Sequence, residues 1–139
     1  MTQPVETTDR KQLYRDLLDA AKQATKHSYA PFSKFIVGSA LRTADGSVYT
    51  GCNVENSNFA NSICAERTAM VKAMSDGHRE FDAIATVSLQ AADCWPCGVC
   101  RQFLSDFGAG LTVVAEGAGG EIKSMPCAQL LPAAHVPKT

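Results

Sequence analysis

The sequence has no surplus of charge of either sign. Thirteen lysines and arginines stand against fourteen aspartates and glutamates among its 139 residues, which gives a formal net charge of −1. A protein that binds a nucleic-acid backbone or an anionic membrane ordinarily carries a strong positive field. The balance of charge therefore argues against a polymeric nucleic acid or a membrane as the partner.

Long apolar stretches are also missing. No run of apolar residues approaches the roughly 20 that cross a bilayer, and residues 1–11 lack the apolar core of a signal peptide. We therefore expect a cytoplasmic protein. The content of 45% apolar and 19% charged residues is that of an ordinary globular chain. We predict a flexible N-terminus over residues 1–8 and a single domain over residues 9–139.

Cysteine, by contrast, is plentiful. In a small secreted chain six cysteines would indicate three disulfides, whereas in a reducing cytosol they indicate thiol chemistry or metal binding. Cys97 and Cys100 have the two-residue spacing that lets both thiolates of one turn reach a tetrahedral zinc ion. This pair alone could equally be a redox dithiol or half of a structural zinc site.

The segment Cys64-Ala-Glu66 supplies a third thiolate and a carboxylate. Residues two apart on a helix do not share a face, so Cys64 and Glu66 converge only if the metal lies off the start of the helix. Free N–H groups and the helix dipole favour thiolates there. Three protein ligands leave the fourth zinc position open, as a catalytic site requires.

Three thiolates also leave an excess of negative charge on the zinc site. Arg67 follows Glu66 directly and Arg101 follows Cys100 directly, so we expect both guanidinium groups to donate hydrogen bonds to thiolate sulfurs. The other cysteines have no comparable spacing, and we interpret Cys52, Cys94 and Cys127 as small buried thiols.

Apolar periodicity and turn residues predict an alternation of helices and strands. We expect a mixed sheet of about five strands covered by helices, an α/β fold in which both cysteine motifs lie at helix N-termini. The predicted helices span residues 9–26, 64–75, 97–107 and 126–131, and the predicted strands span 35–41, 47–53, 84–89, 111–115 and the neighbourhood of residue 122.

The motifs Cys64-Ala-Glu66 and Pro96-Cys-Gly-x-Cys100-Arg-Gln102 together resemble the zinc cytidine deaminase family, in particular its small homotetrameric members with three cysteine ligands. The resemblance runs from about residue 13 to residue 132. It implies a three-layer cytidine-deaminase-like fold with zinc at two helix N-termini. The further matching segments are Tyr29-Ala-Pro-Phe-Ser33, Gly51-Cys-Asn-Val-Glu-Asn56 and Leu130-Leu-Pro132.

The resemblance also implies an activity, the hydrolytic deamination of cytidine and deoxycytidine to uridine, deoxyuridine and ammonia in pyrimidine salvage. One Zn²⁺ per subunit would be held by Cys64, Cys97 and Cys100, with Arg67, Arg101 and Gln102 around them. Glu66 would carry protons to the ring nitrogen and then to the leaving amino group. By the same resemblance, Phe32 packs on the base, Asn53 and Glu55 bind the ribose hydroxyls, and the Ala65 N–H meets the pyrimidine O2. Structural interpretations stay open, with Phe32 in the core and Asn53 and Glu55 in a strand-end turn.

Three positions depart from the family pattern. Phe59 stands where tyrosine is usual, His135 where phenylalanine is usual, and Trp95 where a small residue commonly precedes the Pro-Cys pair. In the family the first two positions reach a neighbouring subunit's site, which implies a homotetramer with shared sites. A second hypothesis is therefore a deaminase of a modified cytosine nucleoside or a cytosine-containing antibiotic. A third, a nucleic-acid-binding or editing module, requires basic patches with aromatic platforms, which the sequence does not clearly show.

Overall fold

The computed structural model describes residues 7–108 and 110–137. The chain order alternates helices and strands, as the sequence predicts. The elements are α1 (Thr7–Ala24), a 3₁₀ turn η1 (Thr25–His27), β1 (Val37–Thr43), β2 (Val48–Cys52), a 3₁₀ turn η2 (Phe59–Asn61), α2 (Ala65–Ser75), β3 (Phe81–Ser88), α3 (Gly98–Ser105), β4 (Thr112–Glu116), β5 (Ile122–Pro126) and α4 (Cys127–Leu130).

The five strands form one mixed sheet in the order β2-β1-β3-β4-β5. β1 is antiparallel to both β2 and β3, β3 and β4 are parallel, and β5 is antiparallel to β4. Because parallel neighbours need a crossover, α3 connects β3 to β4 across one face of the sheet. The predicted mixed sheet of five strands covered by helices is confirmed.

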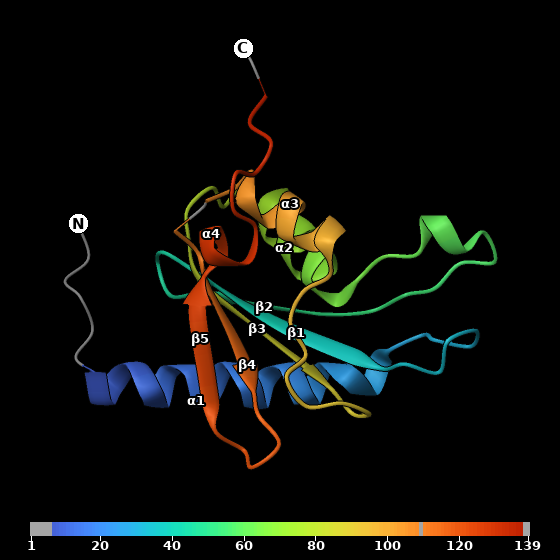
Figure 1. The fold of residues 1–139 in the computed structure, drawn as a ribbon, viewed down its shortest axis with the longest axis horizontal. Coiled ribbons are helices and arrows are strands. Elements are labelled where there is room, and N and C mark those ends of the chain that lie inside the picture. The colour runs from blue at the N-terminus through green and yellow to red at the C-terminus, as the bar shows by residue number, and fades with distance from the viewer. Residues whose placement is uncertain (1–6, 109, 138–139) are drawn as a thin grey trace.

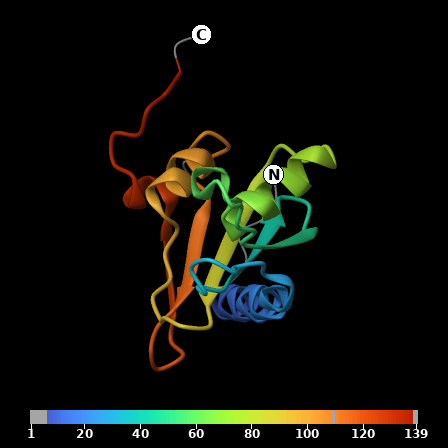
Figure 2. The same ribbon diagram turned by 90° about the vertical axis from the view of Figure 1, so that its right-hand side faces the viewer.

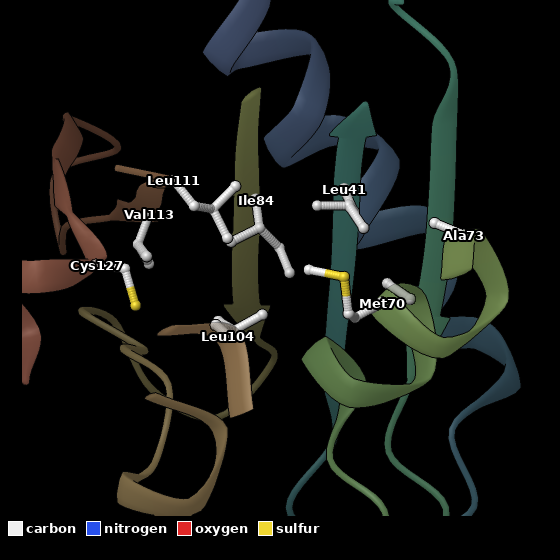
Figure 3. Packing of buried hydrophobic residues seen from close by; sticks show 9 residues of the cluster. Leu41, Met70, Ala73, Ile84, Leu104, Leu111, Val113 and Cys127 are labelled. Carbon is white, nitrogen blue, oxygen red and sulfur yellow. The ribbon is translucent and has the colours of Figure 1, made fainter. Parts of the chain in front are cut away.

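Helices cover the sheet on both faces, which makes three layers. Figures 1 and 2 show α1 on one side of the sheet and α2, α3 and α4 on the other. Within β3, side chains alternate between the layers: Ala83 and Ala85 pack towards α1, whereas Ile84 packs towards α2 and α3. The core between the sheet and α2 and α3 centres on Leu41, Met70, Ile84, Leu104 and Val113 (Figure 3).

The ends of several elements differ from the predictions by a few residues. α1 begins at Thr7, two residues before the predicted start of the helix, and residues 1–6 of the predicted flexible N-terminus lie outside the described residues. α1 ends at Ala24, where the chain tightens into a 3₁₀ turn. No helix of the described ranges is long and apolar enough to cross a membrane.

Two glycines allow helices to lie directly on the sheet. A Cβ atom at Gly51 of β2 would lie 2.5 Å from the Ala65 carbonyl oxygen and 2.6 Å from the Ala69 nitrogen of α2. A Cβ atom at Gly38 of β1 would lie 2.0 Å from the Ala21 carbonyl oxygen of α1. Only a residue without a side chain permits backbones to approach so closely. Gly51 thus fixes the height of the first turn of α2 above the sheet.

Gly51→Ala should push the first turn of α2 away from β2. The nearest atoms to the added methyl group are backbone atoms, which cannot rotate away. We therefore expect the free energy of unfolding to fall by about 1–3 kcal/mol, as in an overpacked core. Urea unfolding monitored by circular dichroism measures it. Gly110→Ala is the matched control, since a Cβ atom there meets nothing within 4 Å. Equal stability of the two variants would contradict this role for Gly51.

Candidate metal centre and substrate cavity

The three cysteines of the two motifs meet at the starts of two helices. Cys64 precedes α2 and Cys97 precedes α3, both with extended backbone, and Cys100 lies in the first turn of α3. Their sulfur atoms all lie within 4.8 Å of one another. The first N–H groups of a helix have no partner within it, so both helices direct positive dipole ends at the sulfurs.

The spacing of these sulfurs fits a zinc ion. Two thiolates at the usual zinc–sulfur distance on a tetrahedral ion lie roughly 3.8 Å apart. The Cys64 and Cys97 sulfurs are 3.7 Å apart. With one Zn²⁺ per chain, the three sulfurs would leave one tetrahedral position open for water or substrate.

The pKa values of the Cys64 and Cys100 thiols shift in opposite directions. The pKa of Cys64 falls to about 5 because the Cys100 thiol donates to it and Arg67 lies beside it, despite partial burial. The pKa of Cys100 rises because it donates to Cys64 and is buried near the Glu66 carboxyl. The cluster therefore favours a negative sulfur at Cys64, the form that binds a metal.

Arg67 lies where the sequence predicts. Its Nη2 donates to the Ser62 carbonyl oxygen at 3.0 Å and to the Cys64 sulfur at 3.7 Å. Its Nε is buried without a partner among the described residues. The Nε–H of Arg67 can therefore donate a further hydrogen bond. Such a donor fits a metal centre whose thiolates carry excess negative charge.

Arg101 and Gln102 make other contacts than expected. Arg101 donates to the Pro96 carbonyl oxygen at 2.7 Å and to the Leu130 carbonyl oxygen at 2.9 Å, so it joins the start of α3 to α4. Gln102 binds both backbone groups of His135, donating at 3.0 Å and accepting at 3.3 Å. Among the described residues, the hydrogen bonds of Arg101 end on these two backbone carbonyl groups, and donation to a sulfur stays a prediction.

Glu66, the second residue of α2, is buried beside the cluster at 3% exposure. Burial raises the pKa of its carboxyl, and the nearby Cys64 sulfur adds to this rise. Among the described residues, the cluster that could hold a metal contains the three cysteines and not the Glu66 carboxylate. The geometry thus separates Glu66 from the metal ligands while keeping it close to them.

A cavity of about 420 Å³ opens over Cys64, Ala65 and Glu66. Its size is within the range of small-molecule sites. Its lining includes the polar residues Asn53 and Glu55. It also includes the apolar residues Phe35, Phe59, Ile63, Trp95 and Val99.

The aromatic residues of the cavity differ in part from those expected. Phe32 is 54% exposed and does not line the cavity, so it is not a core residue either. Phe35, three residues on, does line it, and sequence reasoning missed this residue because its position resembles the start of a strand. Phe59 lines the cavity of its own chain, whereas His135 does not. Cys94 also lines it, and burial raises the pKa of its thiol to about 11.

Asn53 and Glu55 hold the loop before β1 in place. The Glu55 carboxylate accepts hydrogen bonds from the N–H groups of Phe32 and Ser33, both at 3.0 Å, and from the Ser33 hydroxyl. The Ser33 hydroxyl is the main reason that the pKa of Glu55 is lowered. The Asn53 amide accepts from the Val37 N–H at 3.0 Å and donates to the Phe35 carbonyl oxygen at 2.6 Å. These contacts tie the segment that follows β2 to the loop before β1.

Three clustered sulfurs that would leave the fourth position of a bound zinc ion open, beside a buried carboxyl group and under a cavity, fit a hydrolytic metal centre. A family model described as "Cytidine and deoxycytidylate deaminase zinc-binding region" matches residues 11–116. The cytidine deaminase of Sporosarcina psychrophila is 44% identical over 119 residues, which cover 85% of this chain and 88% of that protein.

Solved structures agree with the sequence relatives. The crystal structure of cytidine deaminase from Burkholderia pseudomallei matches with a TM-score of 0.83 and 44% identity, over 87% of this chain and 98% of that one. A blasticidin-S deaminase from Bacillus cereus is 31% identical over 100 residues, 66% of this chain and 71% of that protein. The chain belongs to the cytidine and deoxycytidylate deaminase family, and with it to the zinc-dependent hydrolases that remove an amino group.

Proposed function

We propose that this protein deaminates cytidine and deoxycytidine hydrolytically, giving uridine or deoxyuridine and ammonia, as a step of cytoplasmic pyrimidine salvage. The observation that carries the proposal is the buried Glu66 carboxyl beside three clustered sulfurs, under a cavity of nucleoside size. Zinc, when bound to Cys64, Cys97 and Cys100, supplies a Lewis acid that acidifies water at neutral pH.

Glu66 acts as the proton carrier. Burial raises the pKa of its carboxyl, so the carboxyl accepts a proton more readily than an exposed glutamate does, which suits a group that takes up and releases protons. It takes a proton from water and delivers it to the ring nitrogen of the pyrimidine, which makes C4 more electrophilic. The hydroxide that remains adds to C4, and Glu66 then moves the proton of the new C4 hydroxyl to the amino group, so that the C4–N bond breaks, ammonia leaves and the C4 carbonyl forms.

The start of α2 and the segment that follows β2 orient the substrate. The Ala65 N–H is among the first of its helix, has no intrahelical acceptor, and donates to the pyrimidine O2. Asn53 and Glu55, which line the cavity, bind the ribose hydroxyls. The Glu55 carboxylate accepts three hydrogen bonds from the protein, and a carboxylate has about four acceptor positions, so one stays available for the sugar.

Charge favours free nucleosides over polymers. The chain has a net charge of −1, so it offers no general attraction for a phosphate backbone or a membrane. A phosphate ester on the ribose 3′-oxygen would remove the hydroxyl donor and bring an anion towards Glu55. Nucleic acid is therefore excluded as a substrate on two grounds.

A second candidate substrate is a modified cytosine nucleoside or a cytosine-containing antibiotic. The Trp95 side chain, which stands before the Pro-Cys pair, lines the cavity. Similarity to a blasticidin-S deaminase supports this alternative. Asn53 and Glu55 suit an ordinary ribose, and they therefore favour cytidine over a modified nucleoside or an antibiotic.

Glu66→Gln should keep the fold and one zinc ion per chain, because the carboxyl is not part of the sulfur cluster. Turnover of cytidine should fall by at least roughly 10²–10⁴-fold, the usual contribution of one general acid-base group. Spectrophotometric kinetics and zinc analysis of the same preparation measure both. Turnover near that of the unchanged protein would remove Glu66 from the mechanism.

The protein also forms a homotetramer in which subunits share sites. Figure 1 shows the segment around η2 standing off from the sheet. This segment carries exposed apolar side chains, among them Phe59 at 60% and Ile63 at 39% exposure. Apolar side chains on a projecting segment beside a cavity fit contact with a second copy of the chain.

Phe59→Ala should therefore lower kcat/KM for cytidine roughly 10-fold through loss of one aromatic contact. Its effect on the unfolding free energy of the single chain should stay within about 0.5 kcal/mol. Val48→Ala is the matched control, an exposed apolar residue on the edge strand β2, and should keep full activity. A fully active monomer in light scattering would exclude shared sites.

A further inference from the structure

Trp95 is the only tryptophan of the sequence, and the deamination of cytidine described above gives it no role. Its half-buried side chain packs against the hydrophobic core around Ile84 and Leu104. The same side chain lines the cavity of about 420 Å³ over Cys64 and Glu66. A large aromatic ring that reaches from the core to the cavity is therefore a firmly packed part of the cavity wall.

The backbone on both sides of Trp95 is held in place. The Asp93 N–H donates to the Glu116 carbonyl oxygen at 2.9 Å, and the Asp93 carboxylate pairs with Lys123 at 2.6 Å. These contacts tie the segment between β3 and α3 to β4 and β5. Pro96, directly after Trp95, is fully buried. The Trp95 backbone is therefore fixed relative to the sheet, while packing against the core holds its ring.

The proposed orientation of the substrate decides which edge of the pyrimidine faces this residue. Glu66 delivers a proton to N3 and the Ala65 N–H donates to O2, and both residues belong to the first turn of α2. The N3 and C2 edge of the ring therefore faces the start of α2. C4 faces the sulfur cluster, because the hydroxide adds there. C5 is bonded to C4 on the side opposite N3, so C5 faces away from α2.

Across the sulfur cluster from α2 lies the start of α3. The two helices contact each other on one face of the sheet (Figures 1 and 2). The cavity-lining residues at the start of α3 and directly before it are Cys94, Trp95, Cys97 and Val99. Cys97 is a zinc ligand when the metal is bound, and Trp95 is the largest of the other three. Trp95 is thus the side chain that can fill the space beside C5.

On the basis of the proposed deamination, we propose that Trp95 is a specificity-determining residue whose indole ring lies against the C5 edge of the pyrimidine. It limits the size of a substituent at C5. Because the ring is packed against the core, it does not move aside for a larger group without strain. Cytidine and deoxycytidine carry hydrogen at C5 and are accepted, whereas a nucleoside with a bulky halogen at C5 is a poor substrate.

Trp95→Ala and Trp95→Phe test this role in the zinc-loaded protein, with cytidine and 5-bromocytidine as substrates. Bromine also alters the reactivity of the ring, but that effect cancels when the ratio of the two kcat/KM values is compared between variants. Trp95→Ala should raise the ratio of 5-bromocytidine to cytidine at least about 10-fold, the lower end of what one small group is worth in an apolar pocket. Trp95→Phe, which keeps a smaller ring, should raise it less.

Leu89→Ala is the matched control. Leu89 is an exposed apolar residue of the same connection between β3 and α3, and it does not line the substrate cavity. The ratio of the two kcat/KM values should therefore stay that of the unchanged protein.

Fluorescence tests the contact without turnover and without a variant, because all tryptophan emission comes from Trp95. A bromine atom quenches the emission of an indole ring that it touches. Saturating 5-bromouridine, an analogue of the product, should therefore quench the emission more strongly than saturating uridine. 2′-Bromo-2′-deoxyuridine, which carries its bromine on the sugar, should quench no more than uridine does.

An unchanged ratio in folded, zinc-loaded Trp95→Ala, or equal quenching by the two brominated nucleosides, would overturn this role of Trp95. If Trp95→Ala does not fold, the quenching comparison in the unchanged protein decides. Absence of cytidine turnover in the unchanged protein would instead refute the proposed function. The quenching comparison needs no catalysis, so it separates the two failures.

Discussion

The convergence of two helix N-termini on one point is the constraint on which the rest of the structure depends. Cys64 and Cys97 are 33 residues apart in sequence, yet their sulfurs lie 3.7 Å apart. Three thiolates repel one another unless positive charge lies nearby. The free N–H groups of α2 and α3 and the Arg67 guanidinium supply part of that charge, and the metal ion supplies the remainder.

The sheet brings the two helix starts together. α3 follows β3 and α2 lies against β2, so the strand order β2-β1-β3 fixes the lateral distance between the helices. Gly51 sets the height of α2, because its missing side chain leaves room for the Ala65 carbonyl. A fold that buries its core between sheet and helices therefore also determines where the sulfur cluster and Glu66 lie.

Local sequence patterns predicted much of this arrangement. The spacing within each cysteine motif placed Cys97 with Cys100, and Cys64 with Glu66, because each pair lies within one turn of a helix start. The meeting of the two motifs, 33 residues apart, was implied by the family resemblance and not by spacing. The alternation of helices and strands was also predictable, because apolar periodicity and turn residues are local features of the sequence. What could not be predicted depends on distant partners: the donors of Arg101 end on a carbonyl at Leu130, 29 residues away. Likewise, no local pattern distinguishes Phe35 from Phe32 as the residue that lines the cavity.

The turnover of free nucleosides tests the central claim most directly. The zinc-loaded protein is incubated with cytidine, deoxycytidine, CMP, a cytosine-containing antibiotic and a short cytosine-containing single strand at one salt concentration, and kcat/KM is measured for each. The account predicts uridine and deoxyuridine with release of ammonia, at kcat/KM values above those for all other compounds. Failure to convert cytidine, or a higher kcat/KM for CMP or the strand, would contradict it.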